Sequence, residues 1–427
     1  MGKRCTNDLQ TIAEHPSNWM KRRSAVLYAL SVGSGAAAWA RWPSEGLWNK
    51  CLQLPLPAQL AQHDLVQAAW RDLDVTKIWD THVHLTGLGE GTSRVWVNPQ
   101  MLSVLNPFEF VHAHFYANAA CVTAAQPSAS DPYVERLTKL QQPRPVGAKL
   151  MLLAMDYFYD ESGKQNPSRT VFYAPNDYAA QVAASNPARF EWAASVHPYR
   201  ADWLEALEWA HRHNARAIKW IPSAMGIDPS SPKCHAFYNA LMRLKLPLIC
   251  HGGYEHPLLD SSALQHLNNP LALRSALAHG VRVILAHCAS TGSSADTDQG
   301  KHGPEVENFE LFTRLMAEPH YVGLLFGDIS AITESSRVGG LLRFILEKSD
   351  WHGRLLNGSD YPLPGYLPEI SLDRLVQQKF ITLAAGQVLR EIRHYDPLLF
   401  DFVLKRQINS NGQRFSNSVF ETAAFFS

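Results

Sequence analysis

Two histidines separated by one residue, His82 and His84, have the spacing in this chain that most directly suggests chemistry. They stand near the end of the run Lys77-Ile-Trp-Asp-Thr-His-Val-His-Leu85, which leads into a glycine-rich segment. In a β-strand, residues i and i+2 point to the same face, so both imidazoles can bind one metal ion. Histidines also occur as satisfied core residues, so the interpretation depends on the rest of the chain.

Four more polar residues end apolar runs further along the chain, and loop-forming residues follow each of them. They are Lys219, His251, His287 and Asp360. Imidazole nitrogens and a carboxylate oxygen suit zinc, manganese or iron(II), and such a set leaves room for a water or a substrate oxygen. The lack of thiolates in this set favours a catalytic metal over a structural one.

Apolar runs of strand length alternate with segments of helical periodicity, which is typical of βαβ units. The eight runs are residues 77–85, 148–157, 190–197, 215–221, 246–252, 281–289, 321–329 and 354–360, and the helical segments are 201–214, 234–244, 270–279, 306–317 and 339–348. Because the strands are too apolar to have a solvated face, the pattern favours an α/β fold of the closed (β/α)8 TIM-barrel type over an open doubly wound sheet. In a barrel the carboxyl ends of all strands meet at one mouth, which would bring the polar residues together.

The chain divides into three parts by pattern. Residues 1–74 are an N-terminal extension with a proline-rich linker, 75–407 the barrel, and 408–427 an irregular tail. The segment between the first two strands is too long for a single loop, so we expect an inserted pair of helices at 108–119 and 132–141 that caps the barrel mouth. Residues 370–406 are expected to be helical and to pack on the barrel.

Composition narrows the classes of partner. Lys+Arg and Asp+Glu both number 39 in the 427 residues, so no basic surface for nucleic acid is predicted. The six cysteines have no CxxC spacing and are interpreted as buried thiols, with neither a disulfide framework nor a cysteine zinc site.

The N-terminus resembles a twin-arginine export signal. Lys21-Arg-Arg23 precedes an apolar stretch from Ala25 to Ala40 that ends in the small-x-small form of a cleavage site. The stretch is shorter than the ~20 residues of a spanning helix, so no stable membrane span is expected. A periplasmic location is favoured, with a cytoplasmic one as the alternative.

Six motifs together resemble the amidohydrolase superfamily, in particular the branch that includes aminocarboxymuconate-semialdehyde decarboxylase and related metal-dependent hydrolases. They are Asp80-Thr-His-Val-His84, Ser195-Val-His-Pro-Tyr-Arg200, Ile218-Lys-Trp220, Cys250-His-Gly-Gly253, Leu285-Ala-His-Cys288 and Gly358-Ser-Asp-Tyr-Pro362. The resemblance implies that His82, His84, His251 and Asp360 hold a divalent metal, with zinc first and manganese or iron as alternatives. It also implies that His287 is the acid/base or oxyanion-stabilising residue.

Other residues have less certain roles by sequence. Asp360 can both ligate and act as a base. Lys219 is either carbamylated, bridging two metals, or a cation that orients a substrate oxygen. His197, Arg200 and Asp328 follow strands and are candidates for substrate binding. A second pair, His112 and His114, falls on an expected helix, where residues i and i+2 point apart, and is not expected to bind metal.

The predicted function is a metal-dependent hydrolase that attacks the carbonyl carbon of an amide, lactone or related ester. The alternatives are non-oxidative decarboxylation of an aromatic or unsaturated carboxylate, and a barrel that binds a ligand without catalysis. The expected partner is a small molecule with a carboxylate or carbonyl group, and a homo-oligomer is left open.

Overall fold

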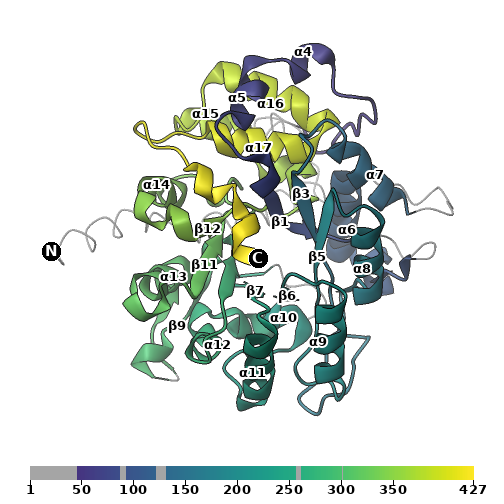
Figure 1. Ribbon diagram of the computed structural model, residues 1–427, viewed down its shortest axis with the longest axis vertical. Helices are drawn as coiled ribbons and strands as arrows, with labels where there is room; N and C mark the ends of the chain where they lie inside the picture. The colour runs from purple at the N-terminus through teal and green to yellow at the C-terminus, as the bar shows by residue number, and fades with distance from the viewer. Residues whose placement is uncertain (1–45, 87–92, 122–130, 256–260, 301) are drawn as a thin grey trace.

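The computed structural model describes residues 46–427 apart from 87–92, 122–130, 256–260 and 301 (Figure 1). The export signal predicted from Lys21 to Ala40 lies outside the described residues, as does Cys5. No helix among the described residues is long and apolar enough to cross a membrane.

Each of the eight apolar runs contains a parallel strand, which confirms the α/β class. One sheet has the order β1-β3-β5 and the other the order β12-β11-β8-β7-β6. The strands are β1 (Trp79–His84), β3 (Lys149–Leu153), β5 (Phe190–Ala193), β6 (Ile218–Trp220), β7 (Leu248–His251), β8 (Val283–Ala286), β11 (Leu325–Asp328) and β12 (Leu355–Leu356). They are almost entirely buried, as expected for strands covered on both faces.

Backbone contacts join the two sheets at both edges. Ala194, just after β5, forms an isolated parallel bridge with Ile218 of β6. At the other edge Val83 of β1 bridges Tyr361, and the Asp360 amide donates to the His82 carbonyl at 2.8 Å. The first and last strands of the series therefore lie side by side.

The helices lie around the central strands (Figure 1). The five segments predicted from periodicity are confirmed as α9 (Trp203–Arg212), α11 (His235–Leu244), α12 (Arg274–Ala278) with the 3-10 turn Pro270–Leu273, α13 (Asn308–Ala317) and α14 (Gly340–Glu347). The structure adds α8 (Asn176–Ser185), α10 (Pro222–Met225) and two short antiparallel pairs, β2 (Trp96–Val97) with β4 (Phe172–Tyr173) and β9 (Ser293–Ala295) with β10 (Glu305–Glu307).

The segment between β1 and β3 contains both expected helices. They are α6 (Pro107–Ala120) and α7 (Pro132–Gln141), each with proline in its first turn, where the missing N–H costs nothing. The Asp131 carboxylate accepts from the Tyr133 amide and caps α7. Before β1 lie α4 (Ala58–Ala61) and α5 (Asp64–Trp70).

The C-terminal part packs against the strands. It comprises α15 (Leu372–Gln377), α16 (Leu383–Tyr395) and α17 (Pro397–Gln407), followed by 3-10 turns at Asn417–Val419 and Thr422–Phe426. The last two aromatic residues, Phe425 and Phe426, are buried in one apolar cluster with Trp79 and side chains from the middle of the strands. Arg282, just before β8, donates to the Phe425 carbonyl at 2.7 Å. The chain end thus covers the amino ends of the strands, in the centre of Figure 1.

One prediction about the cysteines is wrong. Cys51 and Cys121 form a disulfide, with 5.4 Å between their Cα atoms. They are 70 residues apart, and no local pattern shows that the linker before α4 returns to the end of α6. Cys234, Cys250 and Cys288 are buried free thiols, as predicted.

Candidate metal centre

A cavity of about 250 Å³ opens at the carboxyl ends of the strands. Six of the predicted site residues line it together, namely His82, His84, Lys219, His251, His287 and Asp360. They come from five strands or from the short segments that follow these strands. The expectation that strand ends converge on one mouth is met for these six side chains.

The ring of His82 is fixed by Asp328. His82 Nδ1 lies 2.9 Å from Asp328 Oδ2, and neither side chain is more than 1% exposed. Because a carboxylate only accepts, Nδ1 donates and Nε2 keeps its lone pair toward the cavity. Asp328 was predicted to contact substrate; instead it lies under the histidines, where its other oxygen accepts from the His287 amide at 2.9 Å.

His287 is oriented in the same way by Ser330. Its Nδ1 lies 2.8 Å from Ser330 Oγ and 3.2 Å from the Ser330 carbonyl. The Ser330 hydroxyl itself donates to Asp328. Nδ1 of His287 must therefore be the donor, and its Nε2 also carries a lone pair. Sequence reasoning missed Ser330, although its spacing of two from Asp328 was a usable signal.

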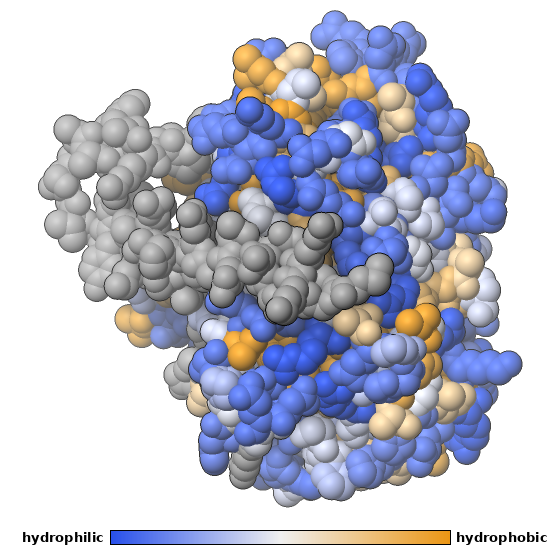
Figure 2. Space-filling model, turned by 90° about the vertical axis from the view of Figure 1, so that its left-hand side faces the viewer, coloured by the Kyte–Doolittle hydropathy of each residue, from blue (hydrophilic) through white to orange (hydrophobic). Residues whose placement is uncertain are grey.

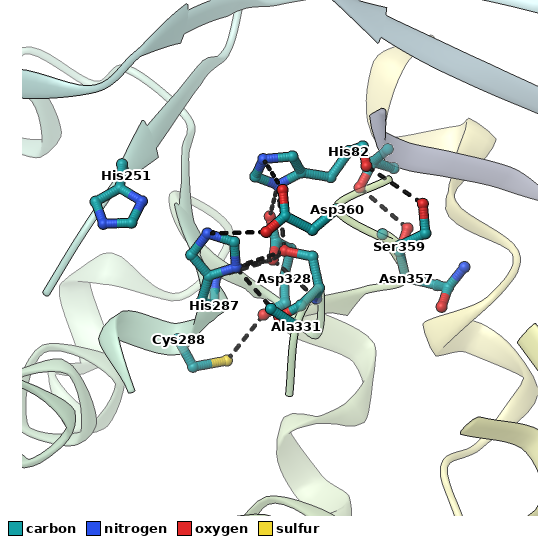
Figure 3. Close-up of polar contacts among 12 residues, drawn as sticks. His82, His251, His287, Cys288, Asp328, Ala331, Asn357, Ser359 and Asp360 are labelled. Carbon is teal, nitrogen blue, oxygen red and sulfur yellow. Dashed lines mark hydrogen bonds and ion pairs between the residues drawn. The ribbon is translucent and has the colours of Figure 1, made fainter. Parts of the chain in front are cut away.

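The Asp360 carboxylate lies near the Nε2 atoms of His82 and His287 (Figure 3), and His84 Nε2 is also close to it. Its oxygens are 3.1 Å from His84, 3.5 Å from His82 and 4.0 Å from His287. Burial alone would raise the pKa of Asp360, but His82, His287 and His84 together hold it well below its usual range. Burial lowers the pKa of His287 to about 3, so its ring is neutral near neutral pH.

The backbone at this site is also unusual. His287 and Asp360 both have φ in the left-handed region, at 55° and 60°. Gly358 lets the last strand approach the first, since a Cβ there would stand 2.6 Å from the His82 Cβ. Such conformations cost energy and tend to cluster where function requires them.

The donor atoms fit a divalent cation. One ligand atom each from His82, His287 and Asp360 lies within 4.8 Å of the others. The Nε2 lone pairs of His82 and His287 face the ionised carboxylate of Asp360. A cation between these three groups would remove the repulsion among them. Imidazole nitrogen and carboxylate oxygen are the ligands that zinc, manganese and iron(II) accept.

His251 lies to one side of this group (Figure 3). Its Nε2 is buried and has no hydrogen-bond partner among the described residues, although Glu255 Oε2 is 3.1 Å away. Burial holds the pKa of His251 well below its usual range and raises the pKa of Glu255 to about 7. A buried nitrogen without a partner is costly, so an additional ligand at Nε2 would be favourable.

Lys219 is the buried cation of the site. Its Nζ donates to His82 Nε2 at 3.0 Å, and only 1% of the residue is exposed. Burial lowers the pKa of the Lys219 ammonium, although the negative charges of Asp328 and Asp360 act to raise it. The amine therefore competes for the nitrogen lone pair that a metal would use.

Two other residues predicted to bind substrate, His197 and Arg200, have partners within the protein. His197 is fully buried and donates from Nε2 to the Met225 carbonyl at 2.9 Å. Arg200 is held by Asp156 at 3.0 Å and by Asp202 at 2.7 Å. Neither side chain is among the described residues that line the cavity. Both follow β5 as predicted, but their polar atoms are used by the protein itself.

Helix α6 contributes residues that sequence reasoning did not assign to the site. His112, Ala113, Tyr116, Ala117 and Ala120 line the cavity. His114 is exposed, and its Nδ1 lies 2.7 Å from the Phe110 carbonyl of the same helix. The two histidines thus point apart, as the helical spacing predicted, but His112 still reaches the cavity.

The chain is similar to one protein family and to several solved structures. A family model described as amidohydrolase matches residues 79–391. No curated protein gives a significant match. Similar solved structures include a protein designated a 2-pyrone-4,6-dicarboxylic acid hydrolase from Pseudomonas putida, with 14% identity, coverage of 76% of this chain and 97% of that one, and a TM-score of 0.41.

Two other solved structures have different activities. A 4-oxalomesaconate hydratase from Rhodopseudomonas palustris has 15% identity, coverage of 75% and 96%, and a TM-score of 0.40. A 5-carboxyvanillate decarboxylase from Novosphingobium aromaticivorans, with bound manganese, has 11% identity, coverage of 75% and 94%, and a TM-score of 0.37. Likenesses at this level do not assign a reaction.

Proposed function

Because this chain belongs to the amidohydrolase family, whose members are metal-dependent enzymes that act on small molecules, we propose that it is a metal-dependent hydrolase. We propose a closed (β/α)8 barrel as its scaffold, since backbone contacts join its two sheets at both edges. The reaction is hydrolysis at the carbonyl carbon of an amide, lactone or related ester. The observation that carries the proposal is the Asp360 carboxylate surrounded by the Nε2 atoms of His82, His84 and His287.

In this proposal His82, His84, His251 and Asp360 hold a divalent ion, zinc in the first place and manganese or iron(II) otherwise. When bound, such an ion supplies a Lewis acid and lowers the pKa of water toward about 7. His251 Nε2, buried and without a hydrogen bond, supports its inclusion although it lies apart from the other three.

The protein's own residues position and move the protons. Asp328 and Ser330 hold the Nδ1 protons of His82 and His287, which leaves both Nε2 atoms facing the cavity. The neutral ring of His287 can accept a proton at Nε2, and the ionised Asp360 can accept one at a carboxylate oxygen. Lys219, which lines the cavity, is proposed to orient the carbonyl oxygen of the substrate through its Nζ.

Metal analysis of the purified protein tests the site without relying on turnover. We expect about one equivalent of divalent ion, near-complete loss in the His82→Ala/His84→Ala variant, and a roughly 10- to 100-fold weaker affinity in Asp328→Asn. The exposed His114→Ala variant is the matched histidine control and should retain the ion. A folded double variant with full metal content would refute the ligand assignment. A ratio of about two metal ions per protein molecule, which falls by one in Lys219→Ala, would instead indicate a binuclear centre.

Turnover assays test the reaction. The metal-loaded protein should hydrolyse members of a panel of lactones, esters and amides, and Asp360→Asn should lower kcat by at least about a hundredfold. Release of carbon dioxide from aromatic acids, without hydrolysis of the panel, would replace the hydrolase by a decarboxylase. A loaded protein that binds these compounds and turns over none of them would be a binding protein.

A further inference from the structure

The cavity has two chemically different parts. Its polar floor consists of His82, His84, Lys219, His251, Glu255, His287 and Asp360. A second part, the apolar wall, comes from the region of β2, β4 and α6 and includes Val97, Met101, Ala113, Tyr116, Ala117, Val171 and Phe172. The one charged lining residue outside the floor, among those described, is Asp156, which pairs with Arg200 at 3.0 Å. The wall is therefore suited to an apolar group.

One face of α6 connects this wall with the surface. Phe108, His112 and Tyr116 follow one another at intervals of four residues, which places them in a row along the helix. The ring centroids are 6.3 Å apart for Phe108 and His112 and 4.7 Å apart for His112 and Tyr116. The last two rings line the cavity, whereas Phe108 is 40% exposed. The row leads from outside the molecule to the cavity.

Exposed apolar side chains precede the row in the chain. Leu102, Val104 and Leu105 precede α6 and are 40%, 72% and 87% exposed, while the neighbouring Met101 is buried and lines the cavity. A cluster of exposed apolar residues on a soluble protein usually marks a binding surface. Another face of α6 already packs inside the protein, because Phe115 and Ala119 are buried and do not line the cavity.

We propose that the substrate of this enzyme is an ester or lactone with an extended apolar arm, which lies along the row from Tyr116 to Phe108 while its carbonyl group lies on the polar floor. This inference rests on the proposed hydrolase function for the reacting group. The arm itself is recognised by α6, whose alanines at 113 and 117 leave room beside the aromatic rings.

A series of p-nitrophenyl esters from acetate to decanoate tests the arm. In the wild-type protein kcat/KM should rise by up to about threefold per added methylene until the row is covered, mainly through KM. Phe108→Ser should reduce the ratio of decanoate to acetate turnover at least tenfold. Phe110→Ser is the matched control, because Phe110 belongs to the same helix but stacks on His114, away from the cavity row, and it should leave that ratio unchanged.

Binding of linear carboxylates, measured by calorimetry, separates the arm from the reaction. Decanoate should bind more tightly than butyrate, and Phe108→Ser but not Phe110→Ser should remove the difference. If no ester is hydrolysed but this binding pattern is found, the proposed reaction fails and the apolar site stands. If turnover and binding are both independent of chain length, or if the two phenylalanine variants behave alike, the apolar arm is refuted.

Discussion

At the scale of single residues, two imidazoles of the site, His82 and His287, depend on partners that do not line the cavity. Asp328 and Ser330 use their oxygens to fix the Nδ1 atoms of His82 and His287. Asp328 is the last residue of β11 and Ser330 lies two residues further on, so the end of one strand orients a histidine on β1 and another just after β8. This division between binding and orienting residues is typical of metal sites in enzymes.

The buried His197 predicts an acid-sensitive stability. Burial lowers its pKa from 6.5 to about 3 in the folded protein. As the pH falls, the unfolded chain takes up a proton at this histidine before the folded protein does. The contribution of His197 to the free energy of unfolding is therefore fully present above pH 6.5 and is lost as the pH falls toward 3. The loss is on the order of 4 kcal/mol. We expect His197→Gln to lower the stability at neutral pH but to flatten its decline below pH 6.5.

Urea unfolding at a series of pH values measures this effect. The exposed His114→Gln variant is the control and should keep the wild-type decline. An equally steep decline in His197→Gln would show that protonation of this ring does not oppose folding.

The residues of the polar floor could be predicted from the sequence, whereas the roles of the residues around the floor could not. His82, His251 and Asp360 could be found because each polar side chain ends an otherwise apolar run. The roles of Asp328 and His197 could not, because a residue after a strand can point into the cavity or under it, and neighbouring atoms decide which. His112 was placed on a helix correctly, but the side of α6 that faces the cavity depends on how the helix packs.

At the scale of elements, α6 is fastened at its carboxyl end. Cys121 ends the helix and forms the disulfide with Cys51. Beside it, the Asn118 side chain accepts from the Asn49 amide at 2.8 Å and donates to the Asn49 carbonyl at 3.0 Å. The linker is thus held against the helix that forms the apolar wall. A disulfide also supports the proposed export, because such bonds persist in oxidising compartments.

Loss of this disulfide should destabilise the protein. Closing a loop of 70 residues removes conformational freedom from the unfolded chain that corresponds to about 4 kcal/mol. We expect Cys51→Ser/Cys121→Ser to lower the melting temperature in the absence of reductant, and dithiothreitol to lower that of the wild type but not that of the variant. Equal melting temperatures for oxidised wild type and variant would contradict the predicted contribution.

Strand positions were predictable and the pairing of distant segments was not. Every apolar run contains its strand, because burial on both faces leaves a clear composition signal. The short pair of strands β2 and β4 has no such signal in its composition. Its two strands are about 75 residues apart in the sequence, and only folding brings them together. The disulfide was missed for the same reason.

At the scale of the whole molecule, the two ends of the parallel strands are covered differently. The site lies at the carboxyl ends, under α6, while Phe425 and Phe426 cover the amino ends (Figure 1). Figure 2 shows one side of the molecule, where hydrophilic residues predominate around scattered apolar ones, as on an ordinary solvated surface. The reacting groups and the chain end therefore lie on opposite sides of the strands.

This separation predicts a variant with altered stability and normal chemistry. Phe426 is 6% exposed and stacks on Trp79 with ring centroids 5.8 Å apart. Phe426→Ala should lower the free energy of unfolding by about 3 to 5 kcal/mol, and the conservative Phe426→Leu by less than about 1.5 kcal/mol. Activity per folded molecule should be unchanged in both. A changed kcat with intact stability would mean that the two ends of the strands are coupled.

The contact between the first and last strands has a consequence for biosynthesis. His82 lies on β1 and Asp360 lies four residues after the end of β12, and a backbone hydrogen bond of 2.8 Å joins the two residues. Because the chain is made from its N-terminus, the histidines leave the ribosome long before the aspartate. A nascent or prematurely terminated polypeptide therefore lacks the complete set of donors. Acquisition of the ion would mark a finished translation product, and incomplete chains would be distinguished by their failure to retain it.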